Sequence, residues 1–323
     1  MNMVQFKQDI TDLLSHKKGG HVQKWLYSDH IRADNSSGSK LWHSFITSNE
    51  SYYPIQSEID LIPILLGRIK TDYDTIIDFG LGDISAVNNK IIPILRSQPA
   101  LKRYIAIDIS DNQLTLGTDI VQTKFPQIQT KSIKGDFYKT RTISGEKRLG
   151  VFLGSTISNQ EMMVGQKLPE QAIINRLITL GHTVKGNESG SLIISYDANP
   201  NLEHALNAYQ HPSWIQMMTG LMYDIQDLAQ PTGNFNPSLW HYAPVIDDKN
   251  HVLHQVITPT VNQSFAIDEH EFNIKKGEQF VVKNNFKYPL DLFTEIVQKA
   301  GLTILAPPIQ SQNNPMAMLE THI

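Results

Sequence analysis

The sequence predicts an α/β fold in which a doubly wound parallel sheet carries an inserted, smaller α+β lobe. Apolar, β-branched runs at 75–79, 102–108 and 148–153 each lead into a turn or an acid, which is typical of strands buried on both faces of a parallel sheet. Stretches with helical spacing separate these runs, as βαβ units require. From about residue 201 the order changes to helices followed by period-2 stretches, which indicates an antiparallel insertion.

The predicted division of the chain follows from this order of elements. Its three parts are a helical segment at 1–57, a sheet domain at 58–200 plus 289–323, and a lobe at 201–288. The elements expected within the lobe are helices near 202–209 and 215–229 and strands near 252–261 and 279–286. After the lobe, a helix at 290–301 and a strand at 302–305 are expected to return to the main sheet.

Length and composition exclude several classes of protein. The chain has 323 residues, 40% of them hydrophobic, which is enough to bury one large core and a smaller second one. A net charge of −4 without runs of like charge gives no footprint for nucleic acid or an anionic membrane surface. The absence of cysteine excludes disulfides, thiolate metal sites and cysteine nucleophiles. No signal peptide or membrane-spanning apolar run is found, so we expect a cytoplasmic protein. We also expect a monomer.

The histidines do not indicate a metal site, although the chain has 12 of them. His241, His251 and His254 lack the spacing of zinc-binding helices and have no carboxylate at a helical offset. We therefore expect no metal.

A glycine-rich turn after the first strand predicts a cofactor site. The residues Asp78, Gly80 and Gly82 form an Asp-x-Gly-x-Gly pattern that runs from a buried strand into the start of a helix. The two glycines let the backbone approach a nucleotide-like ligand, and the helix start offers N–H groups. The third glycine of the dinucleotide fingerprint is missing, which favours S-adenosylmethionine. Asp78 is expected either to organise the turn or to bind the cofactor. An ordinary tight turn is the alternative interpretation of the motif.

Polar residues at the ends of the next strands extend this site. Asp108 ends the second strand, where a carboxylate can bind ribose hydroxyls. Asp136 and Phe137 follow the third strand and are expected to bind the adenine amino group and to stack on its ring. An Asx turn or a helix cap is the alternative role of Asp136. Thr156, in the turn after the fourth strand, either binds the methionine portion of the cofactor or caps the next helix.

Short motifs occur in a fixed order over nearly the whole chain. They are Leu26 with Tyr27, 38–42, 52–54 with Glu58, 78–82, Asp108, 135–137, 152–159, Asp197 with Tyr209, and 286–288. In these motifs and their order the chain resembles the histidine-specific Nα-methyltransferases of ergothioneine biosynthesis and the related fungal dimethylallyltryptophan N-methyltransferases. The resemblance implies a Rossmann-like methyltransferase sheet, S-adenosylmethionine as cofactor and methylation of the α-amino nitrogen of an amino acid.

The resemblance also assigns roles to individual residues. It implies that Asn159 holds the amino group and carboxylate of the substrate, and that the hydroxyls of Tyr52 and Tyr209 bind the carboxylate. These three residues are the expected catalytic set, and Tyr27 is expected to contact the cofactor. Phenol and amide groups suit this task because they are neutral partners that do not compete as charges with the sulfonium. Packing between the lobes is the alternative role of the tyrosines.

The chain departs from the family at the positions that recognise the acceptor. Lys283 and Asn285 stand where the histidine enzymes place a Glu and a Ser against the imidazole, and both are expected to bind substrate. A lysine cannot accept a hydrogen bond from an imidazole N–H and repels imidazolium, so we expect an acceptor other than histidine. A side chain with acceptor groups or negative charge, or an aromatic ring, would suit this lysine better. Exposure on an edge strand is the alternative for Lys283. Ala86 likewise replaces the lysine that follows the family's glycine turn.

Three other functions stay open from the sequence. A catalytically silent homologue that binds S-adenosylmethionine is compatible with the altered acceptor positions, and so is a methyltransferase for a non-amino-acid amine. A nicotinamide-dependent oxidoreductase would share the strand, turn and ribose acid, but the chain lacks both a Gly-x-Gly-x-x-Gly motif and a Tyr-x-x-x-Lys pair at the fourth strand.

Overall fold

The computed structural model describes residues 2–185, 189–311 and 314–323, and the chain forms two compact units. Unit 1 consists of Met1–Tyr52, Ser158–Pro169 and Pro200–Lys287. Unit 2 consists of Tyr53–Ile157, Glu170–Asn199 and Tyr288–Ile323. This grouping differs from the division expected from the sequence, because the amino-terminal segment and 158–169 pack with the lobe rather than forming a separate part or joining the sheet domain.

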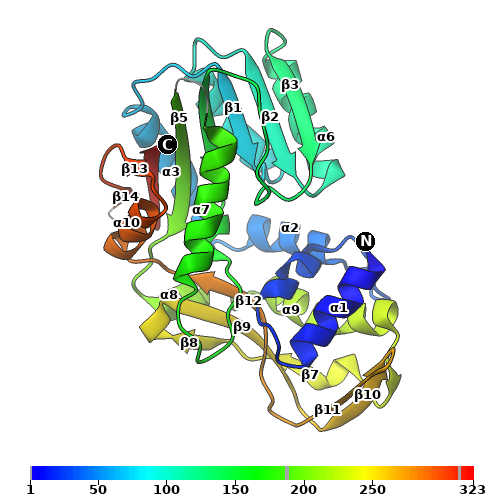
Figure 1. Ribbon diagram of the computed structural model, residues 1–323. Coiled ribbons are helices and arrows are strands. Elements are labelled where there is room, and N and C mark those ends of the chain that lie inside the picture. The colour runs from blue at the N-terminus through cyan, green and yellow to red at the C-terminus, as the bar shows by residue number, and fades with distance from the viewer. Residues whose placement is uncertain (1, 186–188, 312–313) are drawn as a thin grey trace. The chain divides into compact units, whose positions relative to one another are not determined.

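Unit 2 is built on a mixed sheet in which five neighbouring strands, β5, β4, β1, β2 and β3, are parallel (Figure 1). Beside β5, β15 pairs antiparallel with both β5 and β13. The strand order is β13-β15-β5-β4-β1-β2-β3, and β14 pairs with β15. The bounds are β1 Thr75–Phe79, β2 Arg103–Asp108, β3 Gln129–Lys134, β4 Lys147–Phe152, β5 Ser189–Asp197, β13 Thr303–Ile304, β14 Ile309–Ser311 and β15 Asn314–His322. Every residue of β1 is buried, as its unbroken apolar run predicts for a central parallel strand. This order confirms the doubly wound α/β fold.

The helices of unit 2 connect these strands and cover the sheet. They are α3 Pro54–Leu66, α4 Ile84–Ala86, η2 Val87–Ile91, α5 Ile92–Arg96, α6 Asp111–Lys124, α7 Glu170–Val184 and α10 Leu290–Lys299, and the short turn η3 Thr156–Ser158 follows β4. Leu61, Ile62 and Leu65 of α3 share the core with Val87 and Leu95 of the helical segment after β1. The expected helix and strand after residue 290 are present as α10 and β13, and β13 joins the main sheet through β15.

Unit 1 combines helices with two small antiparallel sheets. Its helical segments are α1 Met3–Leu14, η1 His21–Tyr27, α2 Gly38–Ser48, α8 Leu202–Asn207, α9 Pro212–Asp224, η4 Ile225–Ala229, η5 Pro237–Leu239 and η6 Asp248–Asn250. One sheet has the order β12-β9-β7, with β8 also on β9, and the other has the order β11-β10-β6. The bounds are β6 Thr232–Gly233, β7 Trp240–Tyr242, β8 Val245–Asp247, β9 Val252–Pro259, β10 Gln263–Ile267, β11 His270–Ile274 and β12 Phe280–Phe286. The antiparallel pair expected from the period-2 stretches is β9 with β12.

Candidate active site

The glycine turn after β1 lies where the strand order of unit 2 reverses. β1 pairs with β2 on one side and with β4 on the other, and ligands of doubly wound sheets bind at the carboxyl ends of the strands at such a point. Gly80 and Gly82 have φ angles of +81° and +73°, which L side chains rarely adopt. The N–H of Gly80 donates to the Ile107 carbonyl at 2.9 Å and so ties the turn to β2.

The helical segment after this turn begins with an acidic cap. Asp83 Oδ1 accepts a hydrogen bond from the N–H of Ala86 at 2.8 Å. A carboxylate of the chain therefore already occupies part of the positive end of this helix. The segment then passes through a π-turn at Val87–Ile91, a local irregularity that is frequent at functional sites.

Asp78 lies beneath the turn and links two strands. It is buried, and the Tyr104 hydroxyl of β2 donates to Asp78 Oδ2 at 2.7 Å. Burial raises the pKa of Asp78 to about 7, and the nearby charge of Asp108 adds to this rise. This geometry favours the organising role among the two expected for Asp78.

Two acids stand at the ends of β2 and β3. Asp108 is half-buried, its pKa is raised by burial, and its Oδ1 accepts from the N–H of Ser110 at 2.9 Å. A carboxylate has lone pairs beyond those that accept from the neighbouring backbone, so Asp108 retains the capacity to bind a diol. Asp136 is exposed, and its Oδ1 accepts from the N–H of Tyr138 at 2.8 Å. Asp136 therefore forms an Asx turn, which was its alternative role.

An aromatic ring lies close to the glycine turn. A Cβ built on Gly80 would be 3.5 Å from Cε1 of Phe137, so the structure brings these two predicted residues together. The Phe137 ring packs edge-on against Phe152, with 5.4 Å between centroids. Thr156 donates its hydroxyl to the Leu153 carbonyl at 3.3 Å, within the turn after β4. One face of Phe137 is thereby positioned at the carboxyl edge of the sheet.

A buried carboxylate, Glu58 of α3, braces this edge, a role that was not predicted from the sequence. Glu58 is 0% exposed and forms an ion pair with Lys90 from the π-turn. Its Oε1 accepts from the N–H of Gly154 at 2.7 Å and from the hydroxyl of Ser195 on β5. One side chain thus joins the helical segment after β1, the turn after β4 and β5. Its place in the amino-terminal family motif was the signal that pointed to it.

The carboxyl edge of unit 2 fits a nucleotide-like cofactor with no pyrophosphate group. Gly82 and Gly154 are exposed, and both have positive φ, so the backbone is open at the ends of β1 and β4. The acids Asp83 and Asp108 at this edge disfavour a strongly anionic ligand. Open backbone, an aromatic ring and a carboxylate at the end of β2 are features expected of a site for an adenosine-containing cofactor.

In unit 1, strand β12 aligns two polar side chains and a third follows its end. Lys283 and Asn285 alternate along the strand and therefore point to the same face, and Lys287 comes directly after the strand. All three are buried, and Lys283 is only 3% exposed. The alternative that Lys283 faces solvent on an edge strand is wrong, since η1 also packs on β12 and covers it. Lys283 Nζ lies 3.2 Å from Gln23 Oε1.

The pKa of Lys283 is strongly shifted. Burial lowers the pKa of its ammonium group to about 7, and the charge of Lys287 lowers it further in the same direction. Its Nζ also lies 5.7 Å from the ring centroid of Tyr27, which is within the range of a cation–π contact. Tyr27, expected to bind the cofactor, thus belongs to unit 1 and packs against Trp42 with 5.4 Å between ring centroids.

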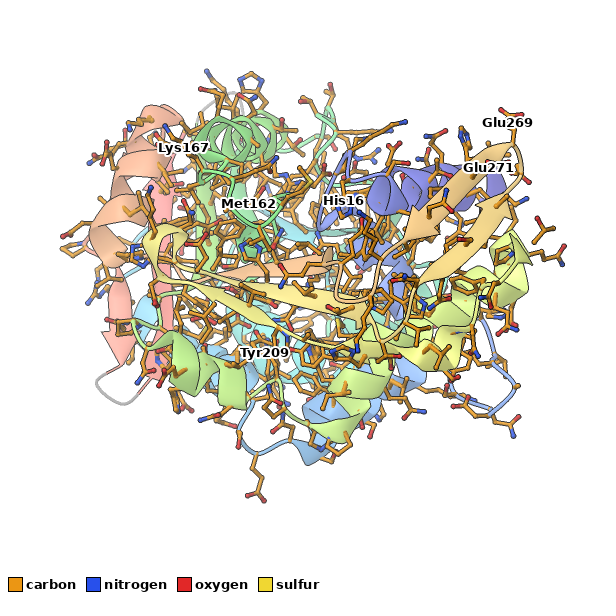
Figure 2. The ribbon with its side chains drawn as sticks, turned by 90° about the horizontal axis from the view of Figure 1, so that it is seen from below. His16, Met162, Lys167, Tyr209, Glu269 and Glu271 are labelled. Carbon is orange, nitrogen blue, oxygen red and sulfur yellow. The ribbon has the colours of Figure 1, made fainter. Side chains whose placement is uncertain are left out.

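The two tyrosines expected to bind substrate meet in an aromatic cluster. The rings of Tyr52 and Tyr209 are 6.1 Å apart, and Phe45 contacts both. Tyr209 lies between α8 and α9 (Figure 2), and Lys287 Nζ is 3.4 Å from its hydroxyl. Trp214 completes the cluster at 4.8 Å from Tyr209. The structure brings Tyr52 and Tyr209 together, and a lysine adjoins the phenol of Tyr209.

Asn159 is held at both its backbone and its side chain. Gln23 Nε2 donates to the Asn159 carbonyl at 3.3 Å, and Asn285 Nδ2 donates to Asn159 Oδ1 at 3.2 Å. Asn285 in turn accepts from Gln255 Nε2 at 2.9 Å. The structure therefore places Asn159 beside Lys283 and Asn285 through hydrogen-bonded partners, although these residues are far apart in the sequence.

The opposite face of β12 has a structural task. Asn284 is 0% exposed and donates to the carbonyls of Gln160 and Met162, each at 2.9 Å. Its Oδ1 lies 2.7 Å from Nδ1 of the buried His254, whose pKa is lowered by burial. Asn284 and His254 thus hold the segment 158–169, which carries Asn159, against the sheet.

Across 2–185, 189–311 and 314–323, three or more histidines and acids never converge as they would around a metal ion. Within the same ranges, each helix is too short or too polar to cross a bilayer.

Comparison with protein families finds a match over almost the whole chain. Residues 6–315 match a family described as histidine-specific, S-adenosylmethionine-dependent methyltransferases. The histidine N-α-methyltransferase of Mycobacterium tuberculosis is 28% identical over 47% of this chain, and the alignment spans 46% of that enzyme. The chain thus covers about half the length of this relative. The N-methyltransferase imqF of Aspergillus flavus is 23% identical over 84% of this chain and 74% of its own length.

Solved structures that align with the chain include a S-adenosylmethionine-dependent methyltransferase from Clostridium acetobutylicum. It has a TM-score of 0.47 and 10% identity, covering 88% of this chain and 98% of that one. A methyltransferase from Aquifex aeolicus has a TM-score of 0.41 and 10% identity, covering 88% and 97%.

Proposed function

We propose that this chain, which belongs to the histidine-specific, S-adenosylmethionine-dependent methyltransferase family, methylates the α-amino nitrogen of an amino acid or amino-acid-derived molecule other than histidine. Family membership makes the chain a methyltransferase and S-adenosylmethionine its cofactor. When bound, this cofactor supplies an electrophilic methyl group on a positively charged sulfur. The chain's own residues must then bind the acceptor, orient its nitrogen and keep that nitrogen unprotonated.

The carboxyl edge of the sheet in unit 2 would hold the cofactor. In this proposal the open backbone at Gly80 and Gly82 admits the cofactor, Asp108 binds its ribose hydroxyls and Phe137 stacks on its adenine. Asp136 would accept from the adenine amino group with the oxygen that its Asx turn leaves over. Thr156 would adjoin the methionine portion from the turn after β4.

Tyr52, Tyr209 and Asn159 of unit 1 would hold the acceptor. Their neutral donors suit a carboxylate, and a reacting nitrogen must be held roughly 3–3.5 Å from its target, so orientation can supply much of the rate. Lys287, and Lys283 in its protonated form, would also lower the pKa of a nearby amine, because positive groups disfavour a further positive charge. A separate general base is therefore not required.

The buried position of Lys283 carries the proposal that the acceptor is not histidine. The resemblance implies that the family's histidine enzymes place an acid at the corresponding position. A buried lysine there presents only donors to an imidazole N–H and repels imidazolium. An acceptor side chain with oxygen atoms, or an aromatic ring on the cation, would be favoured instead.

The test is a mass-spectrometric assay of the purified chain with S-adenosylmethionine and a mixture of the twenty amino acids and common biogenic amines. We expect products heavier by about 14 Da per methyl group on an α-amino nitrogen, as transfer to nitrogen requires, with histidine disfavoured. Preferred methylation of histidine would overturn the assignment of Lys283. Cofactor binding by calorimetry with no methylated product would instead indicate a silent homologue.

A charge reversal sharpens this test. We expect Lys283→Glu to raise turnover of histidine relative to the native acceptor, because the carboxylate restores an acceptor for the imidazole N–H. Lys276→Glu is the matched control, since this lysine of unit 1 is exposed. An unchanged substrate profile in Lys283→Glu would show that the side chain does not contact the acceptor.

A further inference from the structure

A chain of side-chain amides runs through unit 1 and ends on Asn159. The Trp214 indole N–H donates to Gln255 Oε1 at 3.1 Å, and the Tyr242 hydroxyl donates to the same oxygen. Gln255 Nε2 donates to Asn285 Oδ1 at 2.9 Å, and Asn285 Nδ2 donates to Asn159 Oδ1 at 3.2 Å. The first members are thoroughly buried, with Trp214 at 1% and Gln255 at 0% exposure.

The direction of every bond in this chain follows from its first member. An indole N–H can only donate, so the group of Gln255 that faces Trp214 must be its oxygen. The nitrogen of Gln255 then faces Asn285, which must present its own oxygen in return. The nitrogen of Asn285 consequently faces Asn159, whose oxygen must accept. An amide is otherwise free to adopt either of two orientations of nearly equal shape.

A second, shorter chain reaches the backbone of the same residue. When it is protonated, the amine of Lys283 also can only donate, and it bonds Gln23 Oε1 at 3.2 Å. Gln23 Nε2 is thereby directed to the Asn159 carbonyl, to which it donates at 3.3 Å. Trp214 therefore sets the polarity of the first chain, and Lys283 in its protonated form sets that of the second, and both chains converge on Asn159.

We infer that Gln255 and Asn285 are positioning residues that fix the Asn159 amide with its oxygen toward Asn285 and its nitrogen toward the carboxylate of the methyl acceptor. This inference rests on the proposed function, because it names the group of the acceptor that Asn159 recognises. Asn285, expected from the sequence to contact the substrate, acts through Asn159. The acceptor must then carry a carboxylate or an equivalent oxygen group beside its amine.

The sharpest test is Gln255→Glu, measured at pH 9 where the introduced carboxyl group is ionised. A carboxylate still accepts from Trp214 and Tyr242 but cannot donate, so Asn285 and then Asn159 must turn over. The probes are the amino acid that the wild-type protein methylates fastest and the amine that lacks its carboxylate. We expect kcat/KM to fall by about 10- to 100-fold for the amino acid and by less than about 3-fold for the amine.

A pH readout separates this role from simple packing. At pH 6 a protonated carboxyl group in Gln255→Glu can donate to Asn285, so the loss for the amino acid should shrink. Gln263→Glu is the matched control, because Gln263 is a buried glutamine of unit 1 that lies outside the amide chain. An equal loss for the amino acid and the amine, or an equal loss in Gln263→Glu, would overturn the inference.

Substitution of Asn159 itself tests which of its atoms faces the acceptor. If the nitrogen faces a carboxylate, Asn159→Asp should be less active than Asn159→Ala, because it adds like-charge repulsion. If the oxygen faced the ammonium group, Asn159→Asp would be the more active variant, and the inferred orientation would be wrong.

NMR spectroscopy of the Asn159 side chain tests the inference independently of the proposed function. In protein labelled with ¹⁵N-asparagine, the side-chain signals of Asn159 are assigned by their loss in Asn159→Asp. Gln255→Glu should shift them and Gln263→Glu should not. Unshifted signals would overturn the amide chain even if an amino acid is methylated. Shifted signals with no methylated amino acid would instead count against the proposed function alone.

Discussion

The carboxyl edge of the sheet in unit 2 and the inner face of β12 in unit 1 are built by opposite means. At the sheet edge, the main features are backbone features: the positive φ of Gly80 and the capped helix start at Asp83. On β12, they are side chains, with Lys283 and Asn285 each fixed by partners from distant segments. One region offers an open backbone, and the other offers buried polar groups whose orientation is set by neighbours.

This difference teaches where substrate specificity can change. A backbone turn binds the constant parts of a cofactor and tolerates little substitution, since a Cβ at Gly80 would adopt a disfavoured conformation. On a strand face each side chain contributes separately, so under the proposed function the buried lysine at 283 would decide which acceptor the face can bind. The predictions below test each half of this contrast.

The largest expected effect is loss of stability in Lys90→Met, which leaves the buried carboxylate of Glu58 without its cation. Breaking a buried ion pair by removing one partner costs about 3–5 kcal/mol of unfolding free energy. Urea denaturation followed by circular dichroism measures this loss. Lys134→Met is the matched control, because its pair with Asp111 is exposed and is worth less than about 1 kcal/mol. Equal losses in the two variants would show that Glu58 does not brace the sheet edge.

A smaller effect is expected for Asp108→Ala on cofactor binding. Leaving ribose hydroxyls without their acceptor should weaken the affinity for S-adenosylmethionine by about 1–3 kcal/mol. Titration calorimetry measures the dissociation constant directly. Asp119→Ala, at an exposed position on α6, should bind like the wild-type protein. Unchanged affinity in Asp108→Ala would remove this acid from the site.

The sequence predicted the parts of the fold whose signal is local. The β1 run and the glycine turn follow from period and conformation over a few residues, and both are present as expected. β15 was missed because its place between β5 and β13 depends on long-range antiparallel pairing. The hairpin of β10 and β11 was missed because its alternation is short and partly exposed, as Glu269 at its tip shows (Figure 2).

The candidate site divides in the same way. Residues at strand ends, such as Gly80 and Phe137, could be grouped from the sequence because parallel strands end at a common edge. The sequence could not show that Asn285 bonds Asn159 and Gln255, since amide partners are chosen by tertiary packing. It also could not decide whether Lys283 was buried, because lysine is common on exposed edge strands.

Gly80→Ala tests the backbone half of the contrast with a control of equal strain. An alanine at positive φ costs about 1–2 kcal/mol of stability wherever it is placed. Gly277 has the same φ of +81°, and an alanine Cβ added there would lie in open space. Gly277→Ala should therefore lose similar stability. Only Gly80→Ala should also weaken S-adenosylmethionine binding, as measured by calorimetry. Weakened binding in both variants would indicate a general loss of structure rather than a site at the glycine turn.

A change of slope in the pH dependence of stability tests the burial of Lys283. Its pKa falls from 10.5 to about 7 on folding, so between these values the unfolded chain binds a proton that the folded chain does not. Across this window the unfolding free energy of the wild-type protein should therefore rise with pH relative to that of Lys283→Met. The rise should be at most about 1.4 kcal/mol per pH unit. Below pH 7 both states are protonated and the difference between the unfolding free energies of the two proteins should be constant.

Denaturation at pH 6 to 9 measures the unfolding free energy of both proteins as a function of pH. Parallel curves throughout would mean that Lys283 keeps an ordinary pKa, and the strand face would then differ from the sheet edge in its residues but not in its desolvation.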